Sequence, residues 1–68
     1  MGRIMAVIKT KYCDWLYRPD NYDSIYDKMM EITDNDHEES ANAASWCEIA
    51  CLGETYEFRE GYIEIEEI

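Results

Sequence analysis

Residues 40–53 constrain the fold most, because they form the one stretch that is neither strongly charged nor broken by turn residues. Asp36 and Glu39 stand at its start with the spacing of a capping box, in which carboxylates accept from the free amides of a helix's opening turn. Gly53 ends the stretch, and glycine commonly closes a helix in the left-handed conformation. The pattern predicts a central helix with partners on several sides, and it places Trp46 in the core.

The length of the chain predicts one compact domain that spans residues 1–68. A domain this small buries only about 60% of the surface that its unfolded chain exposes, so its stability margin is narrow. The chain has three cysteines, no secretory signal and no long apolar run. We therefore expect free thiols in a reducing bacterial cytoplasm, since an odd number of cysteines cannot close into a disulfide framework.

Charge is distributed unevenly along the chain. Sixteen Asp and Glu against six Lys and Arg give a net charge of −10, yet residues 1–18 carry +3 and residues 19–68 carry −13. Such a field repels nucleic acids and anionic membranes, and it attracts basic protein surfaces. We therefore expect no direct nucleic-acid or membrane binding, and we expect a basic protein partner.

Residues 3–17 fit two descriptions. Their apolar residues recur at helical spacing, and the later part lacks two-residue alternation, so we expect a helix that ends before Pro19. A first strand over residues 4–10 is the alternative. Residues 20–33 show the clearest amphipathic helix, with Asp20 or Asn21 as its N-cap. The expected buried face of that helix consists of Tyr22, Ile25, Tyr26, Met29 and Ile32.

Towards the end of the chain the apolar period changes to two, which is typical of paired strands. A turn at residues 60–61 would set Phe58 opposite Ile63 on one face and Glu57 opposite Glu64 on the other. Together these patterns predict an α+β domain, with three helices packed against a C-terminal antiparallel β-hairpin.

The cysteines and the sole histidine are the candidate ligands of a zinc site. Cys13, Cys47, Cys51 and His37 are enough ligands in number, but His37 and Cys47 are ten residues apart, about 15 Å along a helix. We expect the thiols to be buried as small apolar residues. No phosphate loop or nucleophile–base pair is evident, so we expect no metal, no cofactor and no catalysis.

Two rows of carboxylates are the candidate binding residues, one on the helix at residues 20–33 and one on the hairpin. Acids four residues apart on a helix lie about 5–6 Å from one another and repel, which lowers the stability of a marginal domain. Their spacing resembles that of phosphates along a nucleic-acid strand, so such a face could enter a basic groove. A merely solvated face is the alternative. The predicted partner-binding residues are Asp23, Asp27, Glu31, Asp34, Glu57, Glu64 and Glu66.

Three segments carry a resemblance to a known group of proteins. They are Lys-Tyr-Cys-Asp-Trp-Leu-Tyr at residues 11–17, Ala-Ser-Trp-Cys-Glu-Ile-Ala at residues 44–50 and Gly-Glu-Thr-Tyr-Glu at residues 53–57. Through them the chain resembles short, uncharacterised acidic proteins of phages and mobile elements in Firmicutes, a group to which no chemistry is assigned. In size and charge it is also similar to phage inhibitors of host nucleases, of the anti-CRISPR and anti-restriction type, which share no common motif.

These observations favour a non-catalytic phage-type inhibitor that binds the basic nucleic-acid-binding groove of a host defence nuclease. The alternative is a small regulatory or structural module that forms a homo-oligomer. An exposed hairpin edge at residues 62–68 would favour this alternative, because an unpaired strand is a template for self-association.

Overall fold

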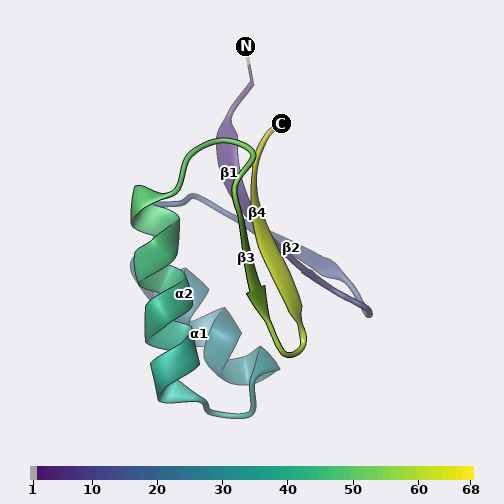
Figure 1. The fold of residues 1–68 in the computed structure, drawn as a ribbon, viewed down its shortest axis with the longest axis vertical. Coiled ribbons are helices and arrows are strands. Elements are labelled where there is room, and N and C mark those ends of the chain that lie inside the picture. The colour runs from purple at the N-terminus through teal and green to yellow at the C-terminus, as the bar shows by residue number, and fades with distance from the viewer. Residues whose placement is uncertain (1) are drawn as a thin grey trace.

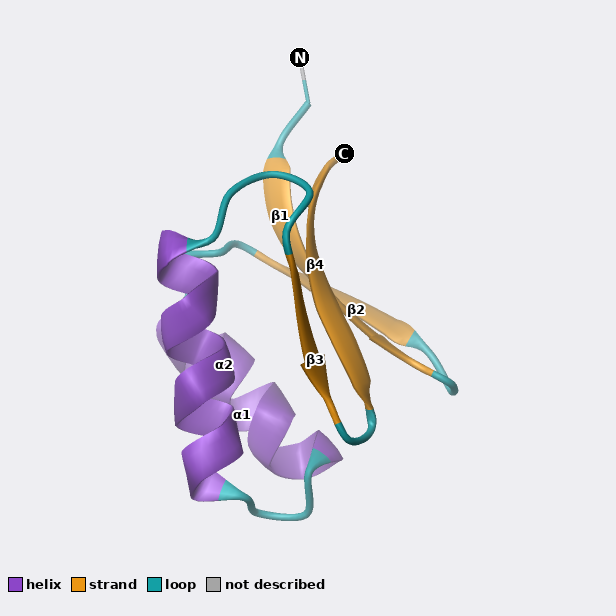
Figure 2. Ribbon diagram, viewed as in Figure 1, coloured by secondary structure: helices purple, strands orange, loops and turns teal. Residues whose placement is uncertain are grey.

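The computed structural model describes residues 2–68, in which a helical pair separates two hairpins of strands (Figure 1). The strands pair in the order β2-β1-β4-β3 as one antiparallel sheet, and both helices lie on the same face of it (Figure 2). The elements in chain order are β1 (Ile4–Thr10), β2 (Asp14–Tyr17), α1 (Tyr22–Ile32), α2 (His37–Ile49), β3 (Thr55–Phe58) and β4 (Gly61–Glu67).

The predicted fold of three helices and a C-terminal hairpin is wrong at its N-terminal end. Residues 3–17 contain the whole β1–β2 hairpin rather than a helix, so residues 2–68 form an α+β domain with two helices and four strands. The alternative of a strand at residues 4–10 agrees with β1. Strand pairing favours the extended conformation over the helix for this segment. Strand β1 pairs with β2 on one side and, on the other, with β4 from the far end of the chain.

Strand β1 lies at the centre of the sheet and is buried on both faces. Ala6 and Ile8 are fully buried on the helix-facing side, and Val7 is 4% exposed on the opposite side. A central strand of this kind carries a continuous apolar run instead of a two-residue alternation. This run explains why the segment also fits helical spacing.

Helix α1 agrees with its prediction. The Asn21 side chain accepts from the Ser24 amide at 3.4 Å, which makes Asn21 the N-cap. Ile25 and Met29 are fully buried, and the other three residues of the predicted apolar face, Tyr22, Tyr26 and Ile32, are half-buried against the core.

Helix α2 begins as predicted but ends earlier. Asp36 accepts from the Glu39 amide at 3.0 Å, so the N-cap is confirmed, whereas the Glu39 carboxylate accepts from the Tyr56 hydroxyl at 3.2 Å. The helix ends at Ile49 rather than near Gly53. Gly53 does have a positive φ of 89°, but it lies in the α2–β3 connection, where its amide donates to the Ile65 carbonyl.

The buried face of α2 is made of small residues, namely Ser40, Ala43, Ala44 and Cys47. These residues allow close approach to α1 and to the sheet, as the composition of the segment predicts. Trp46 is half-buried rather than central in the core. Its ring packs on Tyr56 of β3 with centroids 5.5 Å apart.

The C-terminal hairpin forms, in a register that differs by two residues from the predicted one. Tyr56 pairs with Ile63 and Phe58 pairs with Gly61, so the turn falls at residues 59–60. A shift of two keeps the same side chains on the buried face. Gly61 suits this register, because a Cβ there would collide with the backbone carbonyl of Lys9 on β1.

Candidate functional site

The predicted row on α1 is present and faces solvent. Asp23, Asp27 and Glu31 are all exposed along one side of the helix. Lys28 reaches Glu31 at 3.3 Å, while within residues 2–68 no basic side chain lies within salt-bridge distance of Asp23 or Asp27. The row therefore keeps most of its charge free.

Asp34 extends this row past the end of α1 in an unfavourable place. The Thr33 amide donates to Met29 and the Asn35 amide to the Met30 carbonyl, which closes the helix in a Schellman-type turn. Asp34 occupies the left-handed position of that turn, with φ 57°, where glycine is usual. Its carboxylate also sits at the negative end of the helix dipole.

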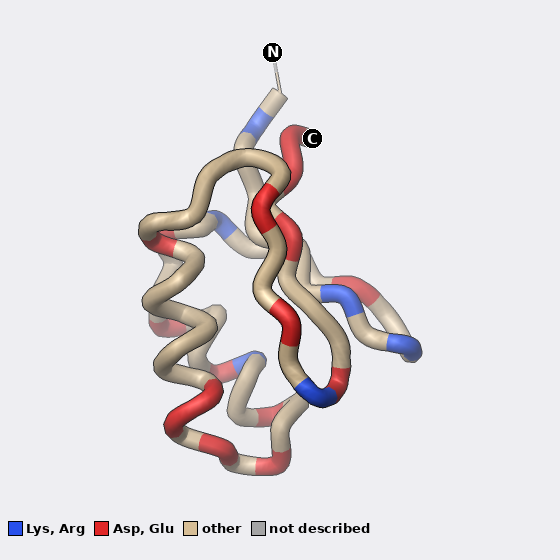
Figure 3. The backbone as a smooth tube through the Cα atoms, in the orientation of Figure 1, with Lys and Arg blue, Asp and Glu red and all other residues tan. Residues whose placement is uncertain are grey.

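More exposed acids continue from Asp34 into the start of α2. Figure 3 shows this concentration of acidic positions around the connection between the two helices. We call the whole set the helical acidic surface. It consists of Asp23, Asp27, Glu31, Asp34, Asp36 and Glu38, all of which are exposed.

The second predicted row, on the sheet, is largely neutralised within the chain. Lys9 of β1 reaches Glu64 at 3.1 Å and Glu66 at 2.6 Å on the helix-free face. The hydrogen bond from Lys9 holds the pKa of Glu66 below its usual value, and the two carboxylates raise the pKa of Lys9. Glu57 faces Tyr62 instead of Glu64, so the predicted like-charge pair does not form.

The structure therefore does not bring the two predicted rows together. One lies on the helical layer and the other on the opposite, uncovered face of the sheet. Sequence reasoning missed Lys9, which neutralises the second row. Lys9 directly follows the buried run of β1, which was the available signal, but only the register with β4 places it beside Glu64 and Glu66.

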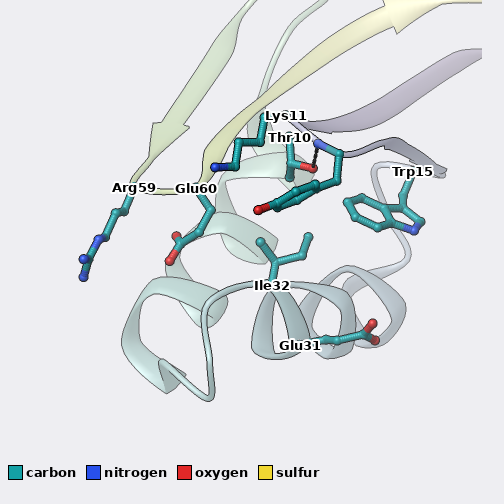
Figure 4. A pocket seen from close by; sticks show the side chains of 8 residues that line it. Thr10, Lys11, Trp15, Glu31, Ile32, Arg59 and Glu60 are labelled. Carbon is teal, nitrogen blue, oxygen red and sulfur yellow. Dashed lines mark hydrogen bonds between the residues drawn. The ribbon is translucent and has the colours of Figure 1, made fainter.

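A hollow of about 490 Å³ lies beside the end of α1, where the turns of both hairpins meet it. Figure 4 shows Ile32 and Trp15 along the hollow, with Lys11 and Glu60 at its rim. Thr10 also lines it, but its hydroxyl donates to the Cys13 carbonyl at 3.0 Å and is occupied. Trp15, Ile32 and Tyr12 give the hollow an apolar lining, and the Lys28 ammonium stands 4.9 Å from the centroid of the Trp15 ring.

The cysteines occupy two kinds of environment, one buried and two exposed. Cys47 is 1% exposed, and burial raises the pKa of its thiol to about 12. Cys13 and Cys51 are exposed, so the expectation that all three thiols are buried is wrong for two of them. Among residues 2–68, no three His, Cys, Asp or Glu side chains are grouped as a metal site would require.

Comparisons of the chain with protein-family models, with curated proteins and with solved structures gave no match. Over residues 2–68, neither helix has the length and apolar character needed to cross a lipid bilayer. The functional argument therefore depends on the geometry and charge of the surfaces described above.

Proposed function

We propose that this protein is a non-catalytic inhibitor, of the kind carried by phages, that binds the basic nucleic-acid-binding groove of a host defence nuclease in the bacterial cytoplasm. The binding surface is the helical acidic surface. The sheet residues Glu64 and Glu66 are left out of it, because Lys9 already neutralises them.

The observation that carries the proposal is the free charge of the α1 row and its extension to Asp34. Asp23 and Asp27 repel each other across one helical turn without a cation between them, and Asp34 sits where both the backbone and the helix dipole disfavour it. Local features that lower stability in a small domain are typical of functional surfaces. A partner with complementary Arg and Lys side chains would turn this cost into binding free energy.

The arrangement on a helix also suits a groove shaped for nucleic acid. The helix holds its carboxylates at about 5–6 Å intervals, comparable with successive phosphates of one strand. The hollow at Trp15 and Ile32 lies at the end of the same row, next to Glu31, and can receive a side chain from the rim of the groove.

The test is capture of partners from a bacterial lysate at low and high salt, followed by displacement of nucleic acid from the captured enzyme. Asp23→Lys/Asp27→Lys should abolish capture and displacement, and wild-type binding should weaken as salt rises. The matched control is Glu48→Lys/Glu67→Lys, which makes the same change in net charge at exposed acids outside the surface. Glu54 is unsuitable as a control, because its carboxylate accepts from the Cys51 amide at 2.6 Å.

An equal loss of capture and displacement in the two double variants would show that the helical acidic surface is only a solvated face. Binding that does not change with salt would have the same meaning. Both variants must first show cooperative thermal unfolding near that of the wild type.

A further inference from the structure

The expected exposed edge at residues 62–68 is wrong, because β4 pairs with β1 on one side and with β3 on the other. The edges of the sheet are β2 and β3, and they differ in what protects them. The edge strand β3 contains the exposed Glu57, and Glu54 directly precedes it. Charged residues on an edge strand hinder pairing with the edge of another sheet. The edge strand β2 carries Leu16, which is 49% exposed. It also belongs to residues 1–18, the part of the chain with a positive net charge.

The backbone of β2 has its free hydrogen-bonding groups at alternate residues. The Thr10 amide donates to the Cys13 carbonyl, which makes these two residues a hydrogen-bonded pair of the β1–β2 ladder. Hydrogen-bonded pairs alternate along an antiparallel ladder, so Trp15 and Tyr17 also face β1. The amide and carbonyl groups of Asp14 and Leu16 therefore point away from the sheet, where no other strand of residues 2–68 lies.

The residues along this edge are complementary to themselves. The segment Asp-Trp-Leu-Tyr-Arg at residues 14–18 has an acid at one end, a base at the other, an aromatic residue on each side of the centre and Leu16 in the middle. Antiparallel pairing of two such segments around Leu16 places each acid opposite a base. A two-fold interface requires this kind of self-complementarity.

We propose that β2 binds β2 of a second copy of this chain, in antiparallel register about a two-fold axis at Leu16, to form a continuous eight-stranded sheet. Leu16 pairs with the partner's Leu16, and Asp14 pairs with the partner's Arg18 in both directions. Asp14 and Leu16 supply outward amide and carbonyl groups, whereas Arg18 supplies only its amide, because its carbonyl already accepts from the Asn21 amide at 3.0 Å. Trp15 then faces the partner's Tyr17 on the helix-facing side, where the side chains of a non-hydrogen-bonded pair approach closely.

Two features of the chain are compatible with this register. Within residues 2–68 the one ion pair of the Arg18 side chain is with Asp20, at 3.5 Å, and both side chains are about three-quarters exposed, so Arg18 is free to move to another carboxylate. Pro19 follows at once and ends the paired segment, because it has no amide to donate.

The charge of the whole chain sets the salt dependence of the dimer. Each copy carries −10, and the long-range repulsion between copies is screened beyond about 8–10 Å at physiological ionic strength. A single short strand pair buries little area, so association depends on concentration. The dimer should therefore strengthen as salt rises, whereas binding of a basic groove should weaken, and failure of one proposal is distinguishable from failure of the other.

The experiment is sedimentation or light scattering of the purified chain over a wide range of concentrations at low and moderate salt. The wild type should shift from monomer to dimer as concentration rises. Leu16→Pro should stay monomeric, because it removes an outward amide that no strand within the monomer uses. Glu57→Pro makes the equivalent change on the β3 edge. The Ile65 amide donates to the Glu54 carbonyl, and hydrogen-bonded pairs alternate along the β3–β4 ladder, so the Glu57 amide points away from β4. This control should still dimerise.

Charge exchange tests the register. Asp14→Arg alone should prevent dimerisation although it lowers the net negative charge, because it sets two bases opposite each other at both ends of the interface. Arg18→Asp alone should prevent it by setting acids opposite acids. A mixture of these two single variants should form a one-to-one heterodimer, and the double variant Asp14→Arg/Arg18→Asp should dimerise like the wild type. A wild type that is monomeric throughout, dimers that survive Leu16→Pro, or single variants whose mixture does not associate would overturn the proposal.

Discussion

Lys9 lies between two carboxylates on the helix-free face of the sheet, with its ammonium 2.6 Å from Glu66 and 3.1 Å from Glu64. It also stands 5.7 Å from the centroid of the Tyr62 ring. Removing this ammonium would leave two acids of one strand next to each other without a cation. The pair of contacts connects the two hairpins of the fold, because Lys9 belongs to β1 and both acids belong to β4.

Lys9→Met should therefore lower the thermal midpoint at neutral pH by more than Lys11→Met, which removes an exposed lysine without an ion pair among the described residues. The difference between the thermal midpoints of the two variants should disappear at acidic pH. The folded-state pKa of Glu66 lies below its ordinary value of 4.5, so its contribution to stability is present above pH 4.5 and is lost as the pH falls below it. Thermal melts of the two variants between pH 3 and pH 7 check this, and a constant difference across that range would contradict it.

Asp34→Gly should stabilise the domain. Glycine adopts the positive φ of 57° without strain, and the change removes a negative charge from the C-terminal end of α1. We expect the free energy of unfolding to rise by about 0.5–1 kcal/mol, which for a domain of this size shifts the midpoint by about 4–8 °C per kcal/mol.

Asp34→Asn separates the two causes of this effect, because it removes the charge and keeps a side chain that tolerates the left-handed conformation. Its gain in urea denaturation should be smaller than that of Asp34→Gly. A loss of stability in both variants would show that the carboxylate has a stabilising contact. Under the proposed function both variants should also bind the partner more weakly.

Gly61→Ala should be the most damaging of the glycine substitutions. The added methyl would collide with the Lys9 carbonyl, which belongs to the backbone and cannot move without disrupting the β1–β4 pairing. Gly53→Ala is the control, because it has open space and only its positive φ of 89° opposes the change. Circular dichroism should show an unfolded chain for the first and a folded, less stable chain for the second. A stable Gly61→Ala would mean that the β1–β4 register is different.

The elements that sequence analysis predicted correctly have their signals close together in the chain. Asn21 and Asp36 cap helices whose first turns they precede, and Ile25 and Met29 repeat at helical spacing within α1. The β1–β2 hairpin could not be recognised in the same way, because its neighbour β4 is at the other end of the sequence. The ion pairs of Lys9 could not be predicted for the same reason, since Lys9 and Glu64 are 55 residues apart in the sequence.

The position of Trp46 shows another limit of local pattern. Its place midway along a helix predicted a buried ring, but α2 turns its small residues to the core and leaves Trp46 beside Tyr56 at the border of the sheet. Periodicity could not distinguish these faces, because small and large apolar residues are interspersed along residues 43–47. A helix that must approach a sheet and a second helix closely buries Ala43 and Ala44 instead.

Trp46→Ala should consequently cost about 2–3 kcal/mol, less than the 3–5 kcal/mol of a fully buried aromatic residue. The lost free energy of unfolding includes the ring contact between Trp46 and Tyr56. Burial and the neighbouring Glu39 raise the pKa of the Tyr56 hydroxyl to about 12. Urea denaturation measures the cost, and Trp46→Phe should recover about half of it. An unchanged midpoint for Trp46→Ala would show that the ring does not cover the core.

The thiols provide an independent test of the core. Cys13 and Cys51 are exposed and should react quickly with a thiol reagent in the native state, while Cys47 is 1% exposed with a pKa of about 12 and should react only when the domain opens. Mass spectrometry should therefore show a double adduct within the dead time and a triple adduct that forms slowly. The slow rate should rise in Trp46→Ala and fall in Asp34→Gly, because opening follows the free energy of unfolding. Fast labelling of all three cysteines in the native wild type would contradict the packing of α2 against the sheet.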